Sequence, residues 1–340
     1  MSTAKKILLT IFAFALGCVW AVGGIFYYQA SRPAGGDSKP GIVVIPPGQP
    51  LKHTAKTLSQ RGFIRSSNAF ILLAYLQKKQ NQIQAGEYEI SPAMLPREIL
   101  RKISSGQTVK YSVTVPEGYS VREIASLFEQ RGLADKDEFM AAAHDRQLTG
   151  PLGIAGDSLE GYLFPETYHI SRTTSEAAIV KAMLELFKDR ILTPANLERA
   201  RELNLDFYQV VTLASLIEKE TGLDAERKLI SSVFHNRLRK KMPLQTDPTV
   251  IYALRENFDG NIRKKDLSVD SPYNTYRHIG LPPGPIASPG LKSVIAALYP
   301  AQTDYLYFVS RQDGNHQFST NLIDHNRAVA EFQLKKPKKS

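Results

Sequence analysis

The pattern of apolar and polar positions divides the chain into one long apolar run and a mixed body. The apolar run begins at Ile7 and ends at Tyr28, and no charged side chain interrupts it. As a helix, these 22 residues would be about 33 Å long, which is enough to cross the hydrocarbon core of a bilayer. Short stretches of helical period and short strand-like stretches follow, so we expect a single transmembrane helix and then an α+β body.

Charges beside the apolar run predict its orientation. Lys5 and Lys6 precede the run and no comparable basic cluster follows it directly, so the positive-inside rule places the N-terminus in the cytoplasm. A cleaved signal peptide would have a shorter apolar core, and a lipoprotein site at Cys18 would leave ten apolar residues behind it. We therefore expect a retained anchor within residues 1–30, then a flexible tether rich in Gly and Pro over residues 31–41.

An internal repeat with an offset of 70 residues follows the tether. Each copy begins with an apolar strand and a Pro-x-Gly turn, which ends at Gly48 or Gly118, and continues through a helix that stops at an Arg-Gly pair to a second helix. The first copy adds a strand at 86–90 and a helix at 96–104. Its strand-helix-helix-strand order resembles a LysM-type glycan-binding module, which we place at 42–108. A spacer without a binding role is the alternative.

The most informative helix is predicted over residues 206–220. Its apolar stripe consists of Val210, Leu213, Ala214 and Ile217. Glu218 and Glu220 fall on the two borders of this stripe, while Lys219 points the opposite way, toward water. A carboxyl group on an apolar border is partly desolvated, and desolvation raises its pKa, as general acid catalysis near neutral pH requires. A solvated Glu-Lys-Glu helix end is the ordinary alternative.

Three other segments carry side chains that suit a sugar ligand. Residues 156–170 mix carboxylates with aromatic rings, among them Glu160 and Tyr162, and a stiff loop over residues 271–290 contains five prolines and three glycines. Between them, Asp247 is a predicted N-cap with proline after it, and polar side chains gather around that helix start. Aromatic rings pack on sugar faces and carboxylates accept hydrogen bonds from hydroxyls. Core packing and helix capping are the alternative explanations.

Composition excludes several classes of function. The 340 residues include 43 Lys and Arg against 33 Asp and Glu, a formal net charge of +10. This balance suits an anionic membrane or wall polymer, and the absence of zinc fingers and nucleic-acid motifs predicts no nucleic-acid partner. The single cysteine allows no disulfide within the chain, and the seven histidines have no metal-ligand spacing. We therefore expect no metal and no cofactor. The basic stretch 335–339 is predicted to be a disordered tail.

Four parts of the chain together resemble the YceG-like (MltG-type) endolytic murein transglycosylases. They lie, in order, at residues 159–168, at 214–220, at 236–238 with 244–252, and at 273–276 with 280–286. Residues 305–309, the N-terminal anchor and the total length also fit. The resemblance implies a catalytic domain, which we place at 109–340.

The resemblance also implies the roles of individual residues. The family carries its catalytic acid on the first glutamate of an Ile-Glu-Lys-Glu segment, which is Glu218 here, and helix geometry alone could not separate it from Glu220. We expect Glu220 either to orient the site or simply to support its packing. The predicted substrate-binding residues are Gln245, Asp247, Thr249, Asn274, Tyr273, Tyr162 and Glu160, with Tyr162 or Tyr273 as the stacking face.

The implied reaction cuts peptidoglycan glycan strands internally and leaves 1,6-anhydro-MurNAc ends. The implied location is the bacterial inner membrane, with the catalytic body in the periplasm, near the synthases that polymerise the strands. Two alternatives stay open. One is a hydrolase that uses Glu218 with a second carboxylate, from Glu220, Glu160 or Asp247. The other is a tethered protein that binds the wall without cutting it.

Overall fold

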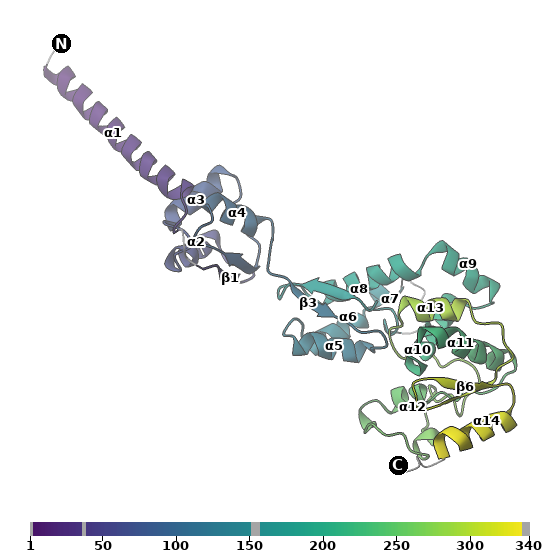
Figure 1. Ribbon diagram of the computed structural model, residues 1–340. Coiled ribbons are helices and arrows are strands. Elements are labelled where there is room, and N and C mark those ends of the chain that lie inside the picture. Colours follow the sequence, from purple (N-terminus) through teal and green to yellow (C-terminus); the bar gives the residue numbers. More distant parts are fainter. Residues whose placement is uncertain (1–2, 36–38, 151–156, 335–340) are drawn as a thin grey trace. The chain divides into compact units, whose positions relative to one another are not determined.

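The computed structural model describes residues 3–35, 39–150 and 157–334 (Figure 1). Part of the predicted tether and the predicted basic tail lie outside these residues. The chain forms two compact units: residues 1–111 with 169–173, and residues 112–168 with 174–340. The described residues contain many helices and three two-stranded sheets, so the predicted α+β class is confirmed.

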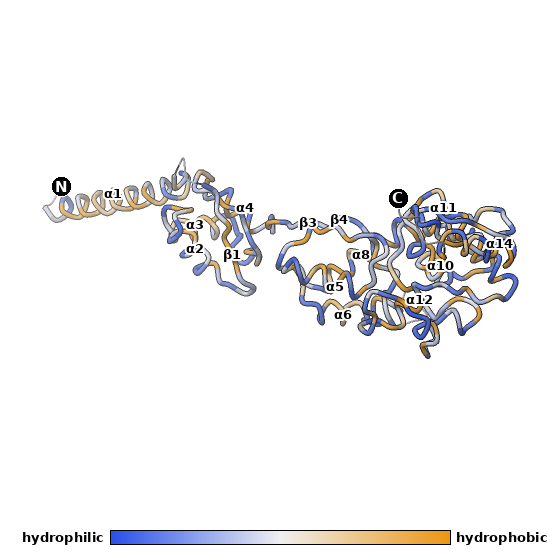
Figure 2. The backbone as a smooth tube through the Cα atoms, turned by 60° about the horizontal axis from the view of Figure 1, so that its bottom comes forward, coloured by the Kyte–Doolittle hydropathy of each residue, from blue (hydrophilic) through white to orange (hydrophobic). Residues whose placement is uncertain are grey.

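The first unit begins with the apolar helix α1 (Thr3–Ser31). Its segment Lys5–Ser31 is long and apolar enough to cross a membrane, and the apolar colour runs along it in Figure 2. The described part of the tether is bound to the unit rather than free. Arg65 Nε donates to the Pro33 carbonyl at 2.7 Å, and the Gly35 N–H donates to the Pro92 carbonyl at 3.1 Å.

The rest of the first unit places helices on one small sheet. Strand β1 (Gly41–Ile45) pairs antiparallel with β2 (Gly86–Ile90), and Val43 and Ile45 point into the core because side chains alternate along a strand. The helices are α2 (Leu51–Gln60), α3 (Ser67–Leu76) and α4 (Pro96–Ser104). The strand predicted at 86–90 and the helix predicted at 96–104 are confirmed. The likeness to LysM stays a prediction.

The second copy of the repeat lies mainly in the second unit, as β3 (Tyr111–Thr114), α5 (Val121–Gln130) and α6 (Lys136–Ala143). Both α2 and α5 end at the predicted Arg-Gly pair, where Gly62 and Gly132 adopt φ of +74° and +63°. Such angles suit glycine because they strain residues that carry a Cβ. The buried Phe70 and Phe139 occupy matching places. Unlike the first copy, the second pairs its strand with β4 (Thr167–Ile170).

Helix α10 (Phe207–Glu220) is the centre of the second unit and packs against several of its helices. Those around it are α9 (Pro194–Glu202), α11 (Asp224–Arg239), α12 (Asp247–Leu254) and α13 (Leu291–Leu298). Helix α8 (Glu176–Ile191), the short α7 (Arg146–Thr149), the hairpin of β5 (Tyr307–Ser310) and β6 (His316–Ser319), and α14 (Leu322–Val329) complete the unit.

Burial of α10 goes further than its apolar stripe predicts, because its polar residues are enclosed as well. Thr212 and Ser215 are fully buried, and their hydroxyl groups donate to backbone carbonyls one turn earlier, at 2.8 and 2.7 Å. Ser215 Oγ also accepts from the Ile286 N–H at 3.1 Å. The proline-rich loop thus covers Ser215, on the side of α10 that the sequence pattern wrongly assigned to water.

The prediction that Asp247 caps α12 is wrong by one residue. Thr246 occupies the N-cap position, and Asp247 is the first helical residue. The Asp247 carboxylate instead accepts a hydrogen bond from the Tyr276 hydroxyl at 2.6 Å. A tertiary contact has therefore replaced the local cap.

Candidate active site

Glu218 lies near the C-terminal end of α10, and its side chain is only 6% exposed. Its Oε1 accepts a hydrogen bond from Arg227 Nη2 at 3.3 Å, and its Oε2 accepts one from the Gly290 N–H at 3.0 Å. Arg227 comes from α11, and Gly290 is the N-cap of α13. Three helices that meet in the second unit therefore hold this one carboxylate (Figure 1).

Arg227 connects Glu218 to two further carboxylates. Its side chain is 6% exposed, its Nη2 lies 3.8 Å from Glu117 Oε2, and its Nη1 contacts Asp224. Its Nε donates to Ser293 Oγ at 3.1 Å. Burying a guanidinium group costs desolvation free energy, and the three carboxylates around Arg227 offset that cost. Arg227 and these carboxylates together determine the net charge of the site.

Glu117 belongs to the Pro-x-Gly turn of the second repeat copy. Glu117 and Glu218 approach the same nitrogen of Arg227, so the two carboxylates lie close together. Partial burial and the Glu218 charge raise the pKa of Glu117, while Arg227 and Lys292 lower it. Glu117 also packs on Gly290, where an added methyl group would overlap its carboxylate.

The remaining cation of this cluster is Lys292, which pairs with Asp224. The hydrogen bond from Lys292 lowers the pKa of Asp224, and Arg227 acts in the same direction. Three carboxylates thus share two cations, which leaves surplus negative charge beside Glu218. Protonation of one carboxyl relieves that charge, and the raised pKa of Glu117 agrees with this expectation.

Glu220 lies two residues after Glu218 and contacts a different set of groups. Its Oε1 accepts a hydrogen bond from the Thr246 hydroxyl, which ties the end of α10 to the start of α12. Burial, aided by the Asp247 charge, raises the pKa of Glu220 to about 7 against the opposing effects of Thr246, His316 and Arg237. Glu220 therefore holds the polar segment that the sequence singled out.

Arg237 organises that same segment from α11. Its Nη1 donates to the carbonyls of Pro243 and Leu244, at 3.1 and 2.8 Å, and lies 3.4 Å from Gln245 Oε1. Gln245 is exposed and has a φ of +51°, which is unusual for a residue other than glycine. Backbone strain of this kind is often found at functional sites.

The other predicted polar residues of this region have internal partners. Thr249 is fully buried, and its Oγ1 contacts the Thr246 carbonyl and Thr275 Oγ1, at 2.8 and 2.9 Å. Asn274 is fully buried, and its Nδ2 donates to the carbonyls of Leu267 and Val269 at 3.0 and 2.9 Å. In this structure both side chains hold the loop together.

The predicted residues Glu160, Tyr162 and Tyr273 belong to an aromatic cluster. Tyr162 is 3% exposed and packs on Phe187 and Tyr208, with ring centroids 4.9 and 6.4 Å away. Tyr273 is partly exposed, and its ring lies 4.9 Å from that of Tyr252.

Glu160 lies beneath this cluster and is 9% exposed. It accepts hydrogen bonds from the Val121 N–H at 3.0 Å and from the Tyr252 hydroxyl at 3.2 Å. Burial raises the pKa of Glu160 to about 7. Glu160 is thus a buried acid whose partners are internal.

The structure therefore sorts the predicted residues into three groups. The Glu218 cluster contains Glu117, Arg227, Asp224 and Lys292, none of which the sequence analysis named as site residues. The second group consists of Glu220 with the segment that contains Gln245 and Asp247. The third consists of Glu160 with Tyr162 and Tyr273. One missed signal was present: Arg227 precedes Ile230 and Phe234 at helical spacing, so it lies on the buried side of α11.

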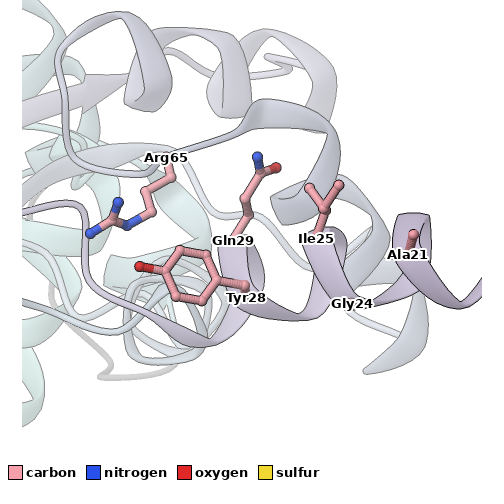
Figure 3. A pocket seen from close by; sticks show the side chains of 6 residues that line it. All are labelled: Ala21, Gly24, Ile25, Tyr28, Gln29 and Arg65. Carbon is pink, nitrogen blue, oxygen red and sulfur yellow. The ribbon is translucent and has the colours of Figure 1, made fainter.

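Two further features bear on ligands. In the described ranges, no group of three or more His, Cys, Asp or Glu side chains is arranged to hold a metal ion. The groove in Figure 3 is lined by α1 and Arg65, all in the first unit, whereas the Glu218 cluster belongs to the second.

Comparison with known proteins reveals close relatives. The chain is 37% identical to a Bacillus subtilis (strain 168) protein named endolytic murein transglycosylase, over 94% of this chain and 92% of that protein. It is 31% identical to a protein of the same name from Streptococcus pneumoniae serotype 2 (strain D39), over 92% of this chain and 62% of that longer protein.

The fold has a solved relative as well. A crystal structure of a yceG-like protein from Listeria monocytogenes matches with a TM-score of 0.59 and 34% identity, covering 85% of this chain and 98% of that one. The model of the YceG-like family matches residues 43–331, which include the whole Glu218 cluster. This chain belongs to the YceG-like family.

Proposed function

We propose that this protein is an endolytic murein transglycosylase that cleaves MurNAc-β-1,4-GlcNAc bonds inside peptidoglycan glycan strands. The observation that carries the proposal is the setting of Glu218, a nearly buried carboxylate held between Arg227 and the Gly290 N–H. The names of the relatives support the same reaction.

Glu218 acts first as a general acid. The protonated carboxyl gives its proton to the glycosidic oxygen, the bond from that oxygen to MurNAc C1 breaks, and GlcNAc departs as an alcohol. An oxocarbenium-like centre remains at C1. A preorganised N–H donor such as that of Gly290 stabilises the carboxylate that forms, so the proton transfer becomes easier.

Glu218 acts second as a general base. The C6 hydroxyl of the same MurNAc attacks C1, and the ionised Glu218 takes the hydroxyl proton. The new C6–O–C1 bond closes a 1,6-anhydro ring, and Glu218 returns to its protonated form. Because the nucleophile is part of the substrate, no second carboxylate has to activate water.

Arg227 and Glu117 set the charge on Glu218 during this cycle. Arg227 already contacts Glu117 and Asp224, so a small movement toward them releases Glu218 without leaving the guanidinium unpaired. Partial burial and the charge of Glu218 raise the pKa of Glu117, so Glu117 responds to the ionisation of Glu218.

The predicted binding residues take two kinds of role. Gln245, Asp247 and Tyr273, which are exposed or partly exposed, contact the sugars, and Tyr273 offers the stacking face. Glu220 orients the Gln245 segment through Thr246. The buried members hold the walls of the site rather than touching sugar; they are Thr249, Asn274, Tyr162 and Glu160.

A hydrolase is the second candidate, and the position of Glu117 favours it. Glu117 and Glu218 share one arginine, and a glycosidase that activates water needs two neighbouring carboxyl groups. In that mechanism Glu117 would take a proton from water, and the products would carry reducing ends. The partner carboxylate would then be Glu117 instead of Glu220, Glu160 or Asp247.

We also infer that α1 anchors the enzyme in the inner membrane, with a cytoplasmic N-terminus and a periplasmic body. The apolar Lys5–Ser31 segment supports the span, and Lys5 and Lys6 support its direction. From this position the enzyme would reach new glycan strands beside the synthases that make them and end their elongation.

Product analysis tests the proposal. The full chain in detergent is incubated with peptidoglycan, and the released ends are identified by mass spectrometry for wild type, Glu218→Gln, Glu220→Gln and Glu117→Gln. Glu166→Gln, which alters an exposed carboxylate of the same unit, is the matched control. We expect anhydro ends from wild type and control, none from Glu218→Gln, and fewer from Glu117→Gln.

Other results would assign the chemistry differently. Reducing ends that disappear in Glu117→Gln would make the protein a hydrolase. Loss of activity in Glu220→Gln with full activity in Glu218→Gln would assign the role of catalytic acid to Glu220 instead of Glu218. Intact binding with no products from any form would favour a protein that binds the wall without cutting it.

A further inference from the structure

Helix α3 presents an apolar face that the described part of the chain does not cover. Ala69, Phe70 and Ala74 face the core of the first unit. On another side, Leu72, Tyr75 and Leu76 are 44%, 59% and 74% exposed. A helix that is apolar on all sides is normally buried or in contact with lipid, so this exposed face needs an explanation.

One neighbour of α3, besides α2 and α4, is the membrane-length helix α1, which packs against it within the same unit (Figure 1). The apolar window of α1 has no buried residue. Phe26, close to the end of the helix, is the first described residue of α1 that is partly buried. If α1 spans a bilayer, the exposed face of α3 therefore lies near the point where the chain leaves it.

The charges around α3 suit an anionic surface. Residues 38–86 contain seven Lys and Arg but no Asp or Glu. Lys78, which is exposed, and Lys79, which is partly exposed, follow the C-cap of α3, and Arg65 precedes its N-cap. Basic residues that lie beside a membrane anchor attract anionic headgroups.

The groove beside α1 has the polarity of a lipid interface (Figure 3). One end of it is lined by Ala21, Gly24 and Ile25, and the other end by Tyr28, Gln29 and Arg65. The Arg65 guanidinium lies over the Tyr28 ring, 5.6 Å from its centroid. A tyrosine and an arginine above an apolar stretch are typical of the headgroup level of a bilayer.

We propose that α3 docks on the lipid surface from which α1 emerges. Leu72, Tyr75 and Leu76 enter the boundary between headgroups and acyl chains, as the apolar side of an interfacial helix does. Arg65, Lys78 and Lys79 bind the phosphates of anionic phospholipids. The first unit is then held against the membrane at two places, α1 and α3. This inference rests on the proposed anchor role of α1.

Tryptophan quenching by lipids tests this docking in the full chain. The only native tryptophan, Trp20, lies in α1 and reports insertion of the anchor. In a Trp20→Phe background, Tyr75→Trp reports on α3. Val44→Trp is the matched control, because Val44 is 53% exposed on β1, which lies farther from α1 than α3 does in Figures 1 and 2.

The proteins are placed in vesicles of phosphatidylcholine and phosphatidylglycerol with brominated acyl chains. We expect strong quenching of native Trp20 and of Tyr75→Trp, and little quenching of Val44→Trp. Adding Lys78→Glu and Lys79→Glu should weaken the quenching of Tyr75→Trp while Trp20 remains quenched in the otherwise native chain.

The outcomes separate the anchor from the docked helix. Unquenched Trp20 would refute the anchor and the docking with it. Quenched Trp20 with unquenched Tyr75→Trp would refute the docking alone, as would equal quenching at positions 44 and 75. A blue-shifted but unquenched Tyr75→Trp would also overturn it, since another protein surface would then cover α3.

Discussion

Replacing Glu160 by glutamine tests whether this residue is a buried structural acid or a group that meets the substrate. In the structure Glu160 is 9% exposed, and burial raises its pKa from 4.5 to about 7. Because the folded-state pKa is the higher one, the stabilising contribution of Glu160 is complete below pH 4.5 and is lost as the pH rises through about 7.

The size of this effect follows from the two pKa values. At about 1.4 kcal/mol per pKa unit, the difference corresponds to about 3 kcal/mol in the free energy of unfolding, most of which disappears between about pH 5 and pH 8. Glutamine cannot ionise, so Glu160→Gln should lack this slope. Loss of one hydrogen bond from Val121 or Tyr252 adds a penalty of about 1 kcal/mol that is the same at every pH.

Urea unfolding of the full chain in detergent, followed by far-UV circular dichroism at several pH values, measures this slope. The stability difference between wild type and Glu160→Gln should change by about 2–3 kcal/mol between about pH 5 and pH 8, with wild type relatively more stable in acid. Both proteins retain the pH dependence of stability that Glu220 contributes, because burial also raises the pKa of Glu220 to about 7. The control Glu166→Gln should run parallel to wild type.

Parallel wild-type and Glu160→Gln curves would refute this account of Glu160. Such a result would mean that Glu160 titrates normally and that solvent reaches it. If turnover by Glu160→Gln also fell while the fold remained intact, Glu160 would return to the list of groups that contact sugar.

Three further changes test the contacts around Glu218 and Glu220. Gly290→Ala should lower turnover and cost about 1–3 kcal/mol in thermal unfolding, because the new methyl group overlaps Glu117 while the backbone φ of −71° is ordinary. Arg227→Met should cost about 3–5 kcal/mol in thermal unfolding near neutral pH, since it leaves the buried Glu218 carboxylate without its cation. Thr246→Val removes the donor to Glu220 and should cost about 1–3 kcal/mol in urea unfolding, with turnover falling if Glu220 orients the site.

Local elements were predictable because their signals are local. The strand at 86–90 and the helix at 96–104 have the predicted bounds, and Asp206 caps α10 with a hydrogen bond to the Gln209 N–H at 2.7 Å. The spacing of apolar residues, the capping residues and the Arg-Gly helix ends each depend only on residues a few positions apart. The sequence alone therefore predicts where these helices and strands begin and end.

Long-range contacts were not predictable in the same way. Glu117 and Arg227 are 110 positions apart, and only the packing of the folded chain brings them to Glu218. Asn274 and Tyr162 also illustrate the difficulty, because amides and aromatic rings suit both a sugar site and a core. Their side chains are bound or packed internally here.

The two glutamates at the end of α10 show why local geometry could not choose between them. Residues two positions apart on a helix point about 200° away from each other, so Glu218 and Glu220 enter different surroundings whatever their chemistry. Burial raises the pKa of Glu220 to about 7, but its carboxylate accepts a hydrogen bond from the Thr246 hydroxyl. Glu218 instead shares a buried arginine with a second carboxylate whose pKa is raised. This shared cluster is assembled by residues far apart in the chain, so no helix pattern could have assigned the acid to Glu218 rather than Glu220.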